Sequence, residues 1–100
     1  MSLSPLQRFI LTSAFEARGK LQRTKLKQFY SSQKRKPSAD DQQRIISRSI
    51  ERLIERGMLI GYGRRTPEKW FIDEVRITAL GRRTARKLYG TQQQLPFTKK

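Results

Sequence analysis

The chain is 100 residues long and contains 23 lysines and arginines against eight aspartates and glutamates, which gives a formal net charge of +15. It has no cysteine and no histidine, so disulfides and thiolate metal sites are excluded and the commonest acid–base group is absent. Such an excess of cations repels itself in a compact state, and it therefore favours a polyanionic partner.

The length predicts one domain, residues 1–90, followed by a mobile or loosely docked basic tail, residues 91–100. No stretch approaches the ~20 apolar residues that span a bilayer, so no membrane partner is expected. The N-terminus lacks a signal-peptide pattern, because Pro5, Gln7 and Arg8 interrupt any apolar run. These features favour a cytoplasmic, nucleoid-associated protein.

The first part of the chain predicts two helices around a short strand. Ser4-Pro5 is a helix-start signal, and Gly19 follows the last residue of the apolar periodicity. Thr24 can cap a second helix, and a basic loop then leads to Pro37, which prevents helix continuation. The predicted elements are a helix over 5–18, a brief edge strand over 20–22 and a helix from about 24 to 32.

The strongest helix signal lies between Ser38 and Gly57. Ser38 can cap the helix, two aspartates suit the positive end of its dipole, and Gly57 offers a left-handed stop. The apolar residues form one stripe, and the basic and polar residues lie opposite. The stripe is Ile46, Ile50, Leu53 and Ile54; the polar face is Arg44, Ser47, Arg48 and Glu51, with Arg52 at its edge.

After Gly57 the pattern changes to that of a hairpin. Residues 58–62 suit a short strand, residues 63–69 a basic turn-rich loop, and residues 70–78 a second strand. Strict alternation would place Phe71, Asp73, Val75 and Ile77 on one face and Trp70, Ile72, Glu74 and Arg76 on the other. We expect Trp70 to pack in the hairpin or the core.

A final helix is predicted over 79–89, capped by Thr78 and stopped by Gly90. The order is thus helix, short strand, helix, helix, strand, basic loop, strand, helix. This is a mainly α fold with a small β-hairpin (α+β), and the order is that of a winged helix-turn-helix.

Two blocks of residues resemble a known family. Residues 44–59, RIISRSIERLIERGML, look like the recognition-helix signature of the MarR-type transcriptional regulators, and residues 75–82, VRITALGR, are similar to the strand-to-helix exit of that family. Members usually carry long terminal helices that build a dimer, and an Asp before the wing arginines. Here the terminal helices are short and Gly63 stands at that place, so a homodimer is possible but not required, and no small-molecule ligand is evident.

The resemblance implies a double-stranded DNA-binding transcriptional regulator whose recognition helix, about 39–56, enters the major groove. Arg44 and Arg48 would pair with guanine, Gln43 with adenine, and Ser47 with a base or a phosphate. The expected contacts are Gln43, Arg44, Ser47, Arg48 and Arg52 on the recognition helix; Arg64, Arg65 and Lys69 on the wing, at the flanking backbone or minor groove; and Lys25, Lys27, Lys34, Arg35 and Lys36 on phosphates.

Carboxylates on the same helix are expected to organise its arginines. Glu51 and Glu55 would either accept from cytosine or, as the favoured alternative, hold Arg48 and Arg52 through i, i+3 and i, i+4 pairs.

Two other functions remain open at this point. One is an RNA-associated or ribosomal basic protein, and the other is a winged-helix protein-interaction module with an acidic partner. An enzyme is not expected, because no histidine can activate a serine or threonine and no glycine-rich phosphate motif occurs. No cofactor and no metal are expected.

Overall fold

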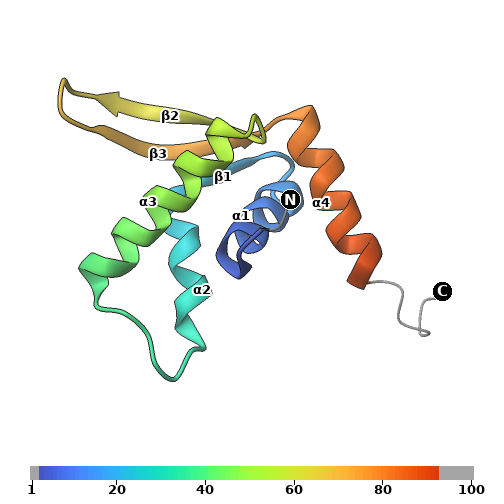
Figure 1. Cartoon of the computed structure of the whole chain (residues 1–100), viewed down its shortest axis with the longest axis horizontal. Helices are drawn as coiled ribbons and strands as arrows, with labels where there is room; N and C mark the ends of the chain where they lie inside the picture. Colours follow the sequence, from blue (N-terminus) through green and yellow to red (C-terminus); the bar gives the residue numbers. More distant parts are fainter. Residues whose placement is uncertain (1–2, 93–100) are drawn as a thin grey trace.

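The computed structural model describes residues 3–92, with side chains for residues 3–90. Four α-helices, a short 3-10 helix and a three-stranded sheet follow in the predicted order, so the winged-helix fold is confirmed (Figure 1). The elements are α1 (Pro5–Glu16), β1 (Lys20–Gln22), η1 (Arg23–Lys27, 3-10), α2 (Gln28–Ser31), α3 (Ala39–Glu55), β2 (Leu59–Arg65), β3 (Trp70–Ile77) and α4 (Ala79–Gln92).

The sheet has the strand order β1-β3-β2, and both pairs are antiparallel. The helices α1 and α3 lie against one face of the sheet, and α4 lies at the end away from the hairpin tip (Figure 1). The apolar stripe of α3 meets α1 and the sheet, where Ile46, Ile50 and Leu53 are fully buried with Ile10 and Val75. Because α3 buries this stripe, its basic side is left at the surface. None of the helices in this part of the chain is long and apolar enough to cross a membrane.

The caps at both ends of α3 form as predicted. The Ser38 hydroxyl accepts from the Asp41 amide at 3.2 Å, and Gly57 adopts a φ of +78°. The helix α1 begins with a full capping box between Ser4 and Gln7. Arg18, at φ 63°, and Gly19, at φ 97°, both leave the helical region after α1, so this helix ends two residues earlier than predicted.

The segment after β1 differs from the prediction. It begins as the 3-10 helix η1 and becomes α-helical only over four residues, and Thr24 makes no capping bond. The tighter 3-10 geometry is common in short connectors. Here it buries Leu26 completely and directs Arg23 towards α3 and β3.

The wing hairpin is more regular than predicted. Strand β2 continues through Gly63, Arg64 and Arg65, so the loop is only Thr66–Lys69. The Thr66 amide donates to the Lys69 carbonyl at 2.7 Å, and the Lys69 amide donates to the Thr66 hydroxyl at 3.0 Å. These bonds close a short turn, and they allow cross-strand pairing up to Arg65 and Trp70.

The predicted alternation along β3 is wrong beyond its first residues. The pairing shifts at Asp73, because Tyr62 is opposite Glu74 while Gly63 is opposite Ile72. This bulge adds one residue to β3 and changes which face the following residues occupy. Ile72 and Val75 are therefore both buried, whereas Phe71 is exposed. Trp70 packs against the core, as predicted.

The cap of α4 forms as predicted, but the predicted end is wrong. The Thr78 hydroxyl accepts from the Gly81 amide at 3.0 Å and donates to the Gly57 carbonyl at 2.6 Å. The helix continues through Gly90 to Gln92, since a single glycine near a helix end costs only about 1 kcal/mol. Most of the predicted tail, residues 93–100, lies outside the described residues.

Two glycines of α4 provide a matched test of this packing. A Cβ at Gly81 would overlap the Met58 carbonyl oxygen and lie 2.6 Å from the Ile77 side chain, whereas a Cβ at Gly90 would meet no atom within 4 Å. We expect Gly81→Ala to lower the free energy of unfolding by about 2 kcal/mol through overpacking. Gly90→Ala should leave it unchanged or raise it by about 0.5 kcal/mol. Urea unfolding of both variants measures the difference, and equal effects would contradict the packing of α4 on the Met58 turn.

Candidate nucleic-acid interface

The outward side of α3 faces the wing across a groove of about 580 Å³. The helix contributes Gln43, Arg44, Ser47, Arg48 and Glu51 to this groove, and β3 with the wing turn contributes residues 69–73. Arg44 and Arg48 are both exposed, and the Arg44 side chain is 73% accessible. The fold thus brings two predicted base-contacting arginines beside the predicted wing lysine, Lys69.

A second groove, of about 550 Å³, lies on the other side of α3, against the N-terminus of α1. Arg48, Arg52 and Arg56 line it together with Ile45, which is 39% exposed. Arg48 lines both grooves and so forms the crest between them. Arg52 is placed towards α1 rather than towards the wing. Ile45 is a residue that the sequence analysis missed, because it lies outside both the apolar stripe and the charged positions.

The wing cations lie over the aromatic rings of β3. The Arg64 guanidinium lies 5.0 Å from the centre of the Phe71 ring, and the Arg65 guanidinium lies 4.4 Å from that of Trp70. Lys69 lies 5.1 Å from Phe71. These contacts hold the charges along the hairpin, with a stabilisation of about 0.5–1 kcal/mol each at exposed sites.

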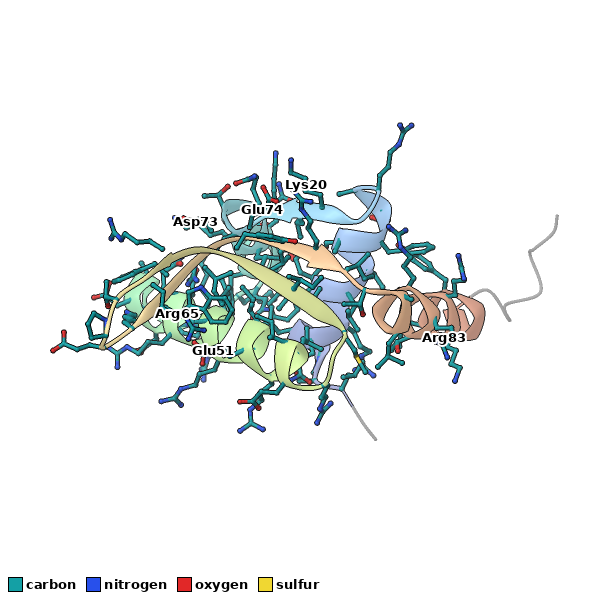
Figure 2. All side chains as sticks on the ribbon, turned by 90° about the horizontal axis from the view of Figure 1, so that it is seen from above. Lys20, Glu51, Arg65, Asp73, Glu74 and Arg83 are labelled. Carbon is teal, nitrogen blue, oxygen red and sulfur yellow. The ribbon has the colours of Figure 1, made fainter. Side chains whose placement is uncertain are left out.

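Two of the wing cations lie beside α3. Lys69 lines the same groove as Arg48, and Arg65 lines a further hollow together with Glu51. Arg64, at the neighbouring position of β2, stacks on Phe71. Figure 2 shows Arg65 and Glu51 near each other and Arg83 of α4 at the opposite end.

The basic side chains predicted to hold phosphates are exposed but lie apart from this groove. They come from η1 and from the loop before α3, and that loop projects beyond the N-terminal end of the helix (Figure 1). The set is Lys25, Lys27, Lys34, Arg35 and Lys36.

The predicted ion pairs along α3 do not form. Within residues 3–90, neither Arg48 nor Arg52 has a carboxylate oxygen within 4.0 Å, and the ion pair of this helix joins Arg44 to Asp41 at 4.0 Å. An exposed ion pair on a helix stabilises the fold by only a few tenths of a kcal/mol, because the entropy lost by two long side chains nearly offsets their attraction. Arg48 is therefore exposed and forms no ion pair within residues 3–90.

The groove itself has mixed charge. Asp40, Glu51 and Asp73 line it beside its four cations, Arg23, Arg44, Arg48 and Lys69. Carboxylates repel phosphates but accept hydrogen bonds from base amino groups. The electrostatics of the groove therefore suit base edges, while the purely basic segments around it suit a phosphate backbone.

Arg23 is the principal site residue that the sequence analysis missed. Its Nε donates to Gln43 Oε1 at 3.1 Å, and its Nη2 donates to the Gln43 carbonyl at 2.8 Å and to Ser47 Oγ at 2.7 Å. Nη1 donates to the Ile72 carbonyl of β3 at 3.4 Å. Arg23 therefore joins η1, α3 and the wing strand, and two residues predicted to contact DNA are already engaged by it.

Burial lowers the pKa of Arg23 from its ordinary value, while the nearby carboxylates Asp73 and Glu51 raise it. An arginine in such a site stays charged at neutral pH. It remains a donor to α3 under all ordinary conditions.

Comparison with known proteins supports the fold. No family model and no curated protein sequence matches the chain. Among solved structures, it is similar to the adhesin competence repressor from Streptococcus pyogenes, with a TM-score of 0.62 and 17% sequence identity over 93% of this chain and 60% of that one. That repressor is a MarR-family winged-helix regulator, so the predicted resemblance is confirmed at the level of the fold. The present chain thus spans 60% of the length of that repressor.

Proposed function

We propose that the protein is a double-stranded DNA-binding regulator. The observation that carries this proposal is the exposed outward side of α3, where Arg44 and Arg48 lie outside the core and line one groove with the wing residue Lys69. An α-helix fits the major groove, and arginine pairs in a bidentate manner with guanine. The net charge of +15 and the likeness to a repressor of the same fold support the same partner.

In this proposal the N-terminal half of α3 lies in the major groove. Arg44 and Arg48 contact base edges, and Arg52, which faces α1, contacts the phosphates on that side. Arg64, Arg65 and Lys69 reach the flanking backbone or the minor groove. The basic residues of η1 and of the loop before α3 bind phosphates beyond the N-terminal end of the helix.

Competition between nucleic acids tests the proposal. A labelled random duplex is bound at low ionic strength and is then competed with unlabelled duplex or with structured RNA. We expect duplex DNA to displace the label at a lower concentration than RNA. An RNA-associated protein would give the reverse order, and a module for an acidic protein would bind no duplex at all.

Selection from a random duplex pool then gives the preferred site and the symmetry of the complex. A homodimer selects an inverted repeat, whose half-sites are about one helical turn apart, and a monomer selects a single site. This experiment decides whether the possible homodimer forms on DNA.

The wing provides a separate prediction. We expect Arg64→Ala/Arg65→Ala to lower duplex affinity about tenfold and to make the salt dependence shallower by about two phosphate equivalents. The base preference of the recognition helix should not change, because phosphate contacts carry no sequence information. Fluorescence anisotropy at several salt concentrations measures both quantities. The Arg64→Lys/Arg65→Lys variant keeps the charges, and it should retain most of the affinity unless the arginines sense the width of the minor groove.

A further inference from the structure

The orientation of the Gln43 side chain is fixed by chemistry. A glutamine amide has a carbonyl oxygen that accepts and an NH₂ group that donates. Arg23 has only donors, and its Nε lies 3.1 Å from the end of the Gln43 side chain, so the atom that faces it must be Oε1. The NH₂ group is consequently turned away from Arg23.

Arg23 is itself held in place by several elements. It donates to the Gln43 main chain at 2.8 Å and to Ser47 at 2.7 Å on α3, and to Ile72 at 3.4 Å on β3. A side chain tied at four acceptors and partly removed from water has little freedom to rotate. The amide that it contacts is therefore restricted as well, although Gln43 still lines the open groove.

Ser47 is affected in the same way. Its hydroxyl oxygen accepts from Arg23, so its own hydrogen remains available to donate. The Gln43 NH₂ group and the Ser47 hydroxyl hydrogen thus remain available as donors. The positive charge of the Arg23 guanidinium disfavours the approach of a further donor to the two side-chain oxygens.

We infer that Arg23 is a positioning residue that sets the base preference of α3, so that Gln43 and Ser47 recognise hydrogen-bond acceptors. This inference rests on the proposed DNA-binding function. The preferred base is guanine, which offers N7 and O6 as acceptors in the major groove, or thymine through O4. Adenine, the base expected from the sequence for Gln43, offers only N7 as an acceptor, and its N6 amino group needs the amide oxygen to accept. Arg23 already uses one of the two acceptor positions of that oxygen, and its positive charge disfavours a second donor there.

The test is selection from a random duplex pool with the wild type and three variants. The base position assigned to Gln43 is the one whose preference is lost in Gln43→Ala. We expect the wild type to favour guanine or thymine over adenine there by about tenfold. Arg23→Met should weaken that preference or shift it towards adenine, and leave the positions assigned to Arg44 and Arg48 unchanged. Circular dichroism and thermal unfolding establish whether this variant folds.

The Gln43→Glu variant tests the inference even if the Arg23→Met variant does not fold. The carboxylate can still accept from Arg23, but it has no donor, so the preference should move to cytosine, whose N4 amino group donates. A wild-type preference for adenine at this position would overturn the inference. So would an Arg23→Met variant that folds and loses affinity equally for all sequences. If no duplex binds at low salt, the proposed function fails instead, and the two failures are thereby distinguished.

Discussion

Replacing Arg44 and Arg48 together by alanine is expected to lower the affinity for the selected duplex by at least about 30-fold. A bidentate arginine–guanine contact contributes about 1–3 kcal/mol of discrimination, and the two side chains are exposed on the outward side of α3. The stability of the fold should hardly change, because Arg48 forms no ion pair and the Arg44–Asp41 pair is exposed. Anisotropy titrations and thermal unfolding measure the two effects separately.

The single substitution Arg48→Ala has a matched control in Arg83→Ala. Arg83 is an exposed arginine of α4 at the end of the molecule away from the wing (Figure 2). Arg83→Ala removes one positive charge, as Arg48→Ala does, so any general effect of net charge is equal in the two variants. We expect the control to lower affinity by less than about twofold. Equal losses in Arg48→Ala and Arg83→Ala would show that duplex binding is only a consequence of the net charge.

The sequence predicted the elements whose signals are local. Both ends of α3 follow from residues within the helix itself, Ser38 and Gly57, and its core face follows from the helical spacing of Ile46, Ile50 and Leu53. The order of elements then led to the winged-helix fold. The exposure of Arg44 and Arg48 could also be predicted, since burying one stripe of a helix exposes the opposite one.

What the sequence did not predict depends on contacts between distant segments. The bulge at Asp73 arises from pairing with β2, and no residue of β3 alone indicates it. Arg23 is 20 residues from Gln43 and 49 from Ile72, and before the fold is known it is one of 23 cationic residues without distinction. Ser47 was predicted on the polar side of α3, and Gln43 lines the same groove, but their donors and acceptors could be assigned only after Arg23 was located.

The salt dependence of binding tests the arrangement of the whole basic surface. If about six phosphates are neutralised, log affinity should fall against log salt with a slope near −5, so that affinity decreases about 10³-fold between 50 and 200 mM salt.

The loop before α3 should account for a definite share of that slope. Lys34, Arg35 and Lys36 are exposed in the loop that projects beyond the N-terminal end of α3. Replacing all three by glutamine should make the slope shallower by about three, and should weaken binding equally for all sequences. The control replaces Arg82, Arg83 and Arg86 of α4, and it removes the same charge from the far end of the molecule. Because counterions are released only where phosphates are contacted, the control should keep the slope of the wild type. A shallower slope in the control and an unchanged slope in the loop variant would place the duplex on α4, and the orientation proposed for α3 and the wing would then be wrong.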